Sequence, residues 1–121
     1  MNEKDLPLVY SCSGCSSAAQ TANTIAIRMD RAKIAEMSCI AGVGGDVKPL
    51  VKTAKSGRDI IAIDGCYLAC SKSCLARHDV VPKHHFVLTD FDVPKVQGED
   101  PNPDLCTSAY DKIMEQIGEE V

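Results

Sequence analysis

Short apolar runs alternate with segments of helical periodicity along most of the chain. Apolar runs that end at glycine or at polar residues are typical of strands. They predict four strands, at residues 6–11, 35–39, 60–63 and 85–88. Between and after these runs, apolar side chains recur every three or four residues, which is typical of helices. They predict four helices, at residues 16–29, 47–54, 66–77 and 105–117.

The order of these elements predicts an α/β fold. Strand and helix alternate four times, with no repeat and no linker long enough to separate two parts, so residues 1–121 are expected to form a single domain. The run Ile60-Ile61-Ala62-Ile63 lacks polar alternation, as expected for a parallel strand covered on both faces. Right-handed crossovers then give a three-layer α/β/α arrangement around a four-stranded parallel sheet, Rossmann-like or flavodoxin-like in type.

Turn and capping residues separate these elements. Asp46 is expected to cap the helix over 47–54, and Asp104 is expected to cap the last helix. The glycine-rich segment 42–45 has two interpretations: a cradle that binds an anion on backbone N–H groups, or a tight turn. It lacks the full spacing of a dinucleotide loop and the Gly-Lys-Ser/Thr of a nucleotide loop. We therefore favour the tight turn, which brings Cys39 close to other cysteines.

Composition narrows the expected location and partners of the chain. The net charge is -4 and no block of lysine and arginine exceeds two residues, which argues against nucleic acid as a partner. Residues 1–10 hold no apolar run typical of a signal peptide, and no segment approaches the roughly 20 apolar residues of a membrane span. The protein is therefore expected in the cytoplasm with no membrane partner. The sequence identifies no protein partner.

Seven cysteines are the main chemical signal in the sequence. Cytoplasmic thiols stay reduced, and an odd number of them without an export signal disfavours a disulfide framework. Four of the cysteines directly follow or end predicted strands: Cys12, Cys15, Cys39 and Cys66. The carboxyl ends of parallel strands form the edge of an α/β sheet where ligands gather, so these thiols are expected to converge. Metal binding or thiol chemistry explains this better than scattered core positions do.

Helical spacing adds a prediction about three of the cysteines. In a helix over 66–77, Cys66 and Cys70 share one face and lie about 6 Å apart along the axis, so they can bind one ion. Cys74 lies about 12 Å from Cys66, whereas two sulfurs on one zinc ion lie within roughly 4–5 Å of each other. Cys74 is therefore expected to face the core.

The cysteine spacing leaves three classes of function open. Four sulfurs from two loops fit tetrahedral zinc, and geometry alone does not decide whether Cys15 or Cys39 completes the set. A thiol oxidoreductase or sulfur-transfer enzyme would use Cys12 with Cys15, or Cys66, because Cys15 and Cys66 are predicted at helix N-termini, which favour the thiolate. An iron–sulfur carrier also needs four cysteines. Whether the chain is an enzyme stays open.

Other residues of possible chemical use have simpler explanations. His78, His84 and His85 are expected to be surface imidazoles, because His84 and His85 fall at the amino end of a strand, opposite the cysteine edge. Asp64 could orient a ligand loop or accept a proton, and the same holds for Asp90. Both lie at strand ends, where aspartate usually supports a turn, and we favour that interpretation.

Four ordered motifs in the chain are similar to a known family. They are Ser11-Cys12-Ser13-Gly14, the segment 39–45, Ile63-Asp64-Gly65-Cys66 with Cys70-Ser71-Lys72, and the stretch 84–90. Over about residues 7–92 the chain resembles the prokaryotic DGC-domain family, named for its Asp-Gly-Cys motif. The resemblance implies zinc binding through four cysteines, which by position are Cys12, Cys39, Cys66 and Cys70. It implies binding and no reaction, with Cys15 and Cys74 as additions in this chain.

Overall fold

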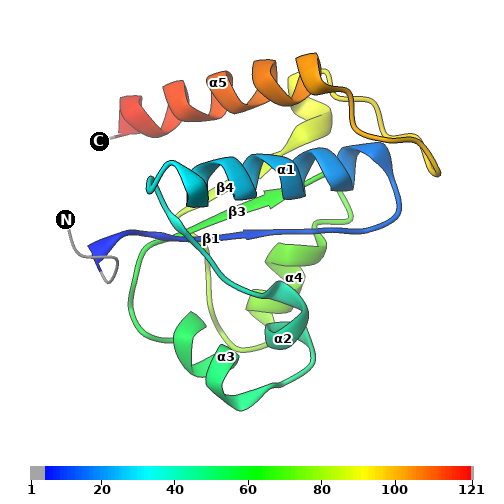
Figure 1. Cartoon of the computed structure of the whole chain (residues 1–121). Helices are drawn as coiled ribbons and strands as arrows, with labels where there is room; N and C mark the ends of the chain where they lie inside the picture. Colours follow the sequence, from blue (N-terminus) through cyan, green and yellow to red (C-terminus); the bar gives the residue numbers. More distant parts are fainter. Residues whose placement is uncertain (1–4, 121) are drawn as a thin grey trace.

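A four-stranded, all-parallel sheet forms the centre of the computed structural model, which describes residues 5–120 (Figure 1). Its strand order is β2-β1-β3-β4. The strands are β1 (Leu8–Ser11), β2 (Glu36–Met37), β3 (Ile60–Asp64) and β4 (His84–Val87). The long strand β3 is buried along its whole length, as the absence of polar alternation predicted. The prediction of a four-stranded parallel sheet is confirmed.

Helices cover both faces of this sheet. The longer pair, α1 (Ser17–Arg31) and α5 (Pro103–Glu120), lies on one face, and three short helices lie on the other (Figure 1). The short helices are α2 (Ile40–Gly44), α3 (Lys48–Ala54) and α4 (Cys70–Ala76), and a 3-10 turn, η2 (Leu88–Phe91), follows β4. Alternate strand residues face opposite ways and fill two separate hydrophobic cores. The three-layer α/β/α arrangement is therefore confirmed.

Helix α1 lies close to the sheet because small residues face it. Ala18, Ala22 and Ala26 are fully buried along one side of the helix, with Ile25 and Met29 filling the remaining space. The helix begins at the carboxyl end of β1, so its position determines how much room remains at that edge of the sheet.

The predicted helix over 66–77 is wrong in its first turn. Helix α4 begins at Cys70, and residues 66–69 form a loop that ends at Ala69 in the left-handed backbone region, with φ of 50°. Cys66 and Cys70 therefore do not share a helical face, and Cys66 is not at a helix N-terminus. The N–H groups of the first turn of α4 are bound by the carboxylate of Asp64, which fixes the start of the helix at Cys70.

Both predicted capping aspartates are also wrong. Asn102, not Asp104, accepts hydrogen bonds from the N–H groups of Asp104 and Leu105, since Pro103 occupies the first helical position. Asp46 does not cap α3, whose N-cap is Val47, and instead pairs with Arg77 of α4.

Two further local predictions need correction. The glycine-rich segment 42–45 is not a simple tight turn, because Ile40–Gly44 forms α2, with backbone bonds such as Val43 N–H to the Cys39 carbonyl. Strand β2 ends at Met37, so Cys39 follows the strand and stands at the N-cap of α2.

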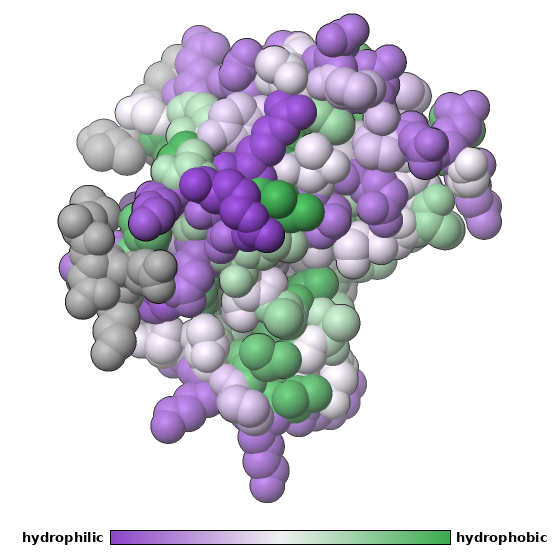
Figure 2. Space-filling view, in the orientation of Figure 1, coloured by the Kyte–Doolittle hydropathy of each residue, from purple (hydrophilic) through white to green (hydrophobic). Residues whose placement is uncertain are grey.

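The surface in the orientation of Figure 1 is mostly polar, with apolar side chains gathered near α2 and α3 (Figure 2). Within residues 5–120, no helix has the combination of length and apolar character that crossing a bilayer requires.

Ser16→Ala is expected to lower the free energy of unfolding by about 1 kcal/mol. Ser16 is buried at the N-cap of α1, and its hydroxyl accepts a hydrogen bond of 3.1 Å from the Ala19 N–H. Urea unfolding followed by circular dichroism measures the change. Ser108→Ala on the exposed face of α5 is the matched control and should stay within about 0.5 kcal/mol of the parent protein.

Candidate functional site

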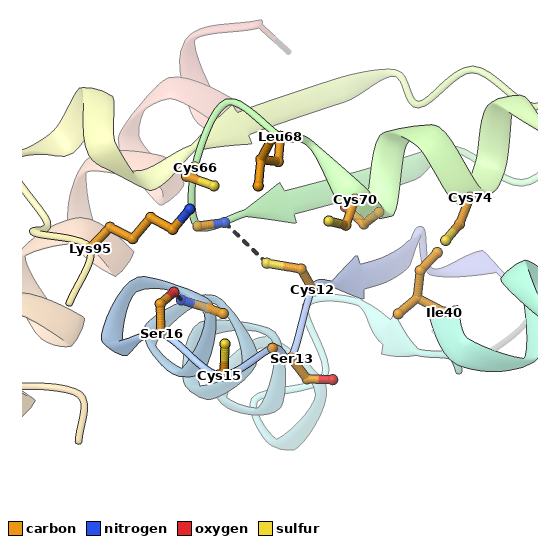
Figure 3. Close-up of a pocket in the computed structure, with 14 residues that line it drawn as sticks. Cys12, Ser13, Cys15, Ser16, Ile40, Cys66, Leu68, Cys70, Cys74 and Lys95 are labelled. Carbon is orange, nitrogen blue, oxygen red and sulfur yellow. Dashed lines mark hydrogen bonds between the residues drawn. The ribbon is translucent and has the colours of Figure 1, made fainter. Parts of the chain in front are cut away.

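A pocket of about 370 Å³ lies at the carboxyl ends of β1 and β3. Its walls come from the segment between β1 and α1 and from the segment that leads from β3 into α4 (Figure 3). Five of the seven cysteines line it: Cys12, Cys15, Cys66, Cys70 and Cys74. All seven cysteines are free thiols. The expected gathering of thiols at this edge therefore holds for two of the three strand ends.

Cys39 is the exception among the expected metal ligands. It is exposed at the N-cap of α2, and the next residue, Ile40, takes the place on the pocket wall. Three of the four expected ligands, Cys12, Cys66 and Cys70, thus share the pocket. Within residues 5–120, no three cysteine, histidine or carboxylate side chains are already arranged to hold one metal ion.

Cys12, the first residue after β1, is more buried than Cys15, the other pocket thiol of this segment. Burial raises the pKa of its thiol to about 11, against the opposing effect of a 3.1 Å hydrogen bond from the Gly65 N–H to its sulfur. The negative charges of Asp64, Cys70 and Cys66 raise this pKa further. In the absence of a cation, Cys12 is therefore a neutral thiol at physiological pH.

Asp64 determines where α4 begins, and its assignment as an ordinary turn residue is wrong. Its carboxylate is 1% exposed and accepts the N–H groups of Ser71 at 2.8 Å and Lys72 at 3.3 Å. These donors belong to the first turn of α4, where free N–H groups attract a carboxylate. Asp64 thereby fixes Cys70, the first residue of the helix, at the pocket.

The histidines are not the surface imidazoles that the sequence predicted. His85 Nε2 lies 2.8 Å from the Asp64 carboxylate, with the His85 side chain 19% exposed. His84 is buried, and His78 Nε2 lies 2.9 Å from the Val43 carbonyl. His85 therefore supports the position of Asp64, since a buried carboxylate needs partners for both of its oxygens.

Gly65 brings the β3 loop into direct contact with the start of α1. A Cβ at this position would lie 2.7 Å from two backbone atoms of α1, Ala18 C and Ala19 N. Only glycine permits this approach, which also directs the Gly65 N–H at the Cys12 sulfur.

Cys74 lines the pocket wall and does not face the core, contrary to the sequence prediction. Its sulfur would lie 2.9 Å from a Cβ at Gly44, so the glycine of α2 makes room for it. Burial raises the pKa of the Cys74 thiol, and the charge of Cys70 raises it further. Arg77, just after α4, also pairs with Asp46, which follows α2, in an exposed ion pair across the same contact.

A family model for the DGC domain matches residues 8–116 of the chain. The chain belongs to the DGC-domain family. It is also 63% identical to the anaerobic and virulence modulator AnvM of Pseudomonas aeruginosa over 95 residues, which cover 78% of this chain and 72% of that protein. No solved structure matches the chain.

The three residues that name the DGC domain have three separate roles in this geometry. Asp64 holds the first turn of α4, Gly65 allows contact with α1, and Cys66 lines the pocket. The motif is thus the junction at which β3, α1 and α4 of the DGC domain meet.

The loop that carries Cys66 is the most open part of this DGC site. Tyr67 and Leu68 are 73% and 71% exposed. The Tyr67 hydroxyl donates a hydrogen bond to the carboxylate of Asp90, the third residue of η2. Asp90 therefore links η2 to this loop.

The sequence did not predict several residues that line the pocket. Ile40, Leu68 and Lys95 line the pocket beside the thiols. Leu68 lies two positions after Cys66, and this closeness to the motif could have indicated it from the sequence. Lys95 lies in a polar loop 29 positions beyond Cys66 (95 minus 66), and nothing in its sequence context connects it with the cysteines.

Asp64→Asn is expected to lower the free energy of unfolding by about 2 kcal/mol, because it weakens three hydrogen bonds to a charged group. Urea unfolding checks the loss. Asp92→Asn is the matched control, since Asp92 is exposed and its left-handed backbone, with φ of 62°, suits asparagine. Equal stability of the two variants would contradict the role given to Asp64.

Gly65→Ala is expected to lower the free energy of unfolding by about 1–3 kcal/mol, since the added methyl group meets backbone atoms that cannot rotate away. Gly118→Ala in α5 should have the opposite sign, a gain of about 0.5–1 kcal/mol, because a Cβ there has no atom within 4 Å. Thermal unfolding of both variants measures the contrast. A neutral Gly65→Ala would show that the close contact is unimportant.

Proposed function

We propose that the protein binds a metal ion, most suitably zinc, through the thiolates of Cys12, Cys66 and Cys70. The observation that carries this proposal is that five thiols from two distant segments line one pocket at the ligand-binding edge of the sheet. Thiolates select soft or borderline ions such as zinc, and no carboxylate among the described lining residues would favour magnesium or calcium. The donor set therefore fits zinc.

Metal binding requires the pocket sulfurs to come closer together, and we infer that the Cys66 loop is the part that moves. Sulfurs bound to one zinc ion at about 2.3 Å are roughly 4 Å apart, closer than the present arrangement of three ligands allows. Residues 66–69 carry two strongly exposed side chains and no regular structure, so their displacement disturbs little packing. Cys70 stays in place, since Asp64 holds its helix turn.

Cys39 is the fourth ligand that the family resemblance implies. Whether it binds the metal is decided by the Cys39 variant below. Because Cys39 is exposed and outside the pocket lining, it would bind only if the start of α2 moved inward. Cys15 and Cys74 already line the pocket and compete for the same role. The proposal commits to three ligands and leaves the fourth position to experiment.

A thiol oxidoreductase or sulfur-transfer enzyme that uses Cys12 with Cys15, or Cys66, is less well supported. Cys66 lies in the loop before α4 and not at a helix N-terminus that would favour its thiolate. Nucleophilic cysteines need a lowered pKa, whereas burial raises that of Cys12. An iron–sulfur carrier would need the same thiols, and the brown colour of anaerobically purified protein would distinguish it from colourless zinc protein.

A regulatory use of the metal fits the name of the P. aeruginosa relative, an anaerobic and virulence modulator, better than a reaction does. We place the protein in the cytoplasm, where the thiols of the pocket stay reduced and free to bind metal.

Full-length protein purified without chelator or affinity metal is expected to contain about one zinc ion per chain by elemental analysis. Cys12→Ser, Cys66→Ser and Cys70→Ser should each lower this content by about tenfold or more, as expected when a bound thiolate is lost. Cys106→Ala is the control, because Cys106 is buried in α5 away from the pocket. The Cys15, Cys39 and Cys74 variants identify any fourth ligand.

Chelation should lower the melting temperature without abolishing helical circular dichroism, since the two hydrophobic cores form without metal. A zinc content that is unchanged in the Cys12→Ser, Cys66→Ser and Cys70→Ser variants would refute the proposal.

A further inference from the structure

We propose that the pocket also binds a short-chain carboxylate that carries a second oxygen at its far end. The carboxylate lies on the backbone N–H groups of residues 14–16 and on the ammonium of Lys95, and the second oxygen accepts a hydrogen bond from the hydroxyl of Ser71. No cysteine sulfur takes part in these contacts, so the inference does not depend on the proposed metal ion.

The segment between β1 and α1 has its carbonyl groups bound from outside the pocket. The side-chain amide of Gln20 donates to the Ser13 carbonyl at 3.2 Å and to the Gly14 carbonyl at 2.8 Å. The Gly98 N–H donates to the Cys15 carbonyl at 3.3 Å. Gln20 and Gly98 do not line the pocket, whereas the three residues whose carbonyls they bind do. These three carbonyls therefore point away from the pocket.

The N–H groups that follow these carbonyls have no acceptor in the described part of the chain. In a trans peptide bond the N–H points opposite to the carbonyl of the preceding residue, so the N–H groups of residues 14–16 are directed toward the pocket. They lie at the start of α1, a helix of 15 residues whose N-terminal end favours negative charge. Consecutive N–H groups at such an end bind anions, which suits a carboxylate.

Lys95 is held beside these N–H groups by the chain on both sides of it. The Pro94 carbonyl accepts the Ser17 hydroxyl at 2.9 Å, and the Val96 N–H donates to the same hydroxyl at 3.0 Å. The Ser17 N–H also donates to the Val96 carbonyl at 2.8 Å. These bonds fasten residues 94–96 to the start of α1, and the Lys95 side chain extends from there toward the thiols (Figure 3). The ammonium and the N–H groups thus serve the same end of the pocket.

The charge and the walls of the pocket determine the class of ligand. Among the described residues, Lys95 has no ion-pair partner and is the one cationic side chain that lines the pocket. One lysine balances one negative charge, which favours a carboxylate over a phosphate dianion. Ile40 and Leu68 offer apolar contact for a short hydrocarbon chain. The volume of about 370 Å³ lies in the range of about 300–1,000 Å³ that small-molecule sites occupy.

Ser71 determines the second polar group of the ligand. Its side chain is fully buried on the α4 wall of the pocket, and its hydroxyl has no hydrogen-bond partner among the described residues. A buried hydroxyl without a partner costs free energy, and an acceptor atom brought by a ligand removes that cost. The Ser71 N–H is bound by Asp64, so the residue is fixed in the first turn of α4. The hydroxyl is therefore a positioned donor that calls for an oxygen on the ligand.

The test uses isotopically labelled full-length protein as purified, with its zinc content measured alongside and its amide signals followed by proton–nitrogen correlation NMR. The probes are 4-oxopentanoate, which has both polar groups, pentanoate, which lacks the second oxygen, and 2-pentanone, which lacks the carboxylate. Both carboxylates should shift the amide signals of residues 14–16 to saturation, with 4-oxopentanoate acting at the lower concentration. The neutral ketone should leave these signals unchanged.

Two variants separate the two ends of the ligand. Lys95→Gln should weaken the binding of both carboxylates by about two- to fivefold, because the exposed ammonium forms an ion pair of modest strength. Ser71→Ala should lower the affinity ratio of 4-oxopentanoate to pentanoate by about two- to tenfold, since only the first ligand loses a hydrogen bond. Lys112→Gln and Ser108→Ala, at exposed positions of α5 outside the pocket, are the matched controls and should keep the affinities of the parent protein.

Each other outcome overturns the inference. Amide signals of residues 14–16 that neither carboxylate shifts refute the site. Shifts that are spread over exposed lysines and are unchanged by Lys95→Gln show nonspecific ion binding and also refute it. A ratio that Ser71→Ala leaves unchanged shows that the hydroxyl does not contact the ligand. Inorganic phosphate that binds more tightly than pentanoate overturns the choice of a carboxylate.

Discussion

A buried carboxylate holds the functional end of this molecule together. Asp64 is almost inaccessible to solvent, so both of its oxygens must be satisfied within the protein, and the first turn of α4 together with His85 supplies the partners. Because the partners include backbone N–H groups, the carboxylate fixes the path of the chain and not only a side chain. The loop over residues 66–69 must then span the distance between a fixed strand end and a fixed helix start.

Close packing on the opposite side of the pocket complements this constraint. The small residues of α1 let the helix approach the sheet, and Gly65 uses that approach to bring its N–H to the Cys12 sulfur. The thiol of Cys12, after β1, is thereby linked to the loop after β3, the neighbouring strand in the sheet. The sheet edge collects segments that are distant in sequence, and the two contacts at residues 64 and 65 determine how closely they meet.

The sequence was sufficient for the parallel sheet, its helical layers and the gathering of thiols from β1 and β3, because those follow from periodicity and from strand-end positions. It was wrong about Cys39, which lies outside the pocket. It was insufficient for the start of α4, since helical spacing alone does not reveal that a buried Asp64 delays the helix to Cys70. The predictions for Cys74 and the histidines were wrong for the same reason. Contacts with residues distant in the sequence determine these positions, and a local sequence pattern does not reveal such contacts. Lys95 was missed for the same reason, because its place depends on contacts with Ser17.

The turn that carries Cys66 also carries Tyr67 and Leu68, two of the most exposed large apolar side chains in residues 5–120. Chemistry at the sulfur and the outline of the protein are therefore mechanically linked over a few bonds. If the proposed metal draws this turn inward, the exposed apolar side chains of Tyr67 and Leu68 move with it. A protein that contacts only this exposed surface would then respond to a change at the Cys66 sulfur without contacting the pocket.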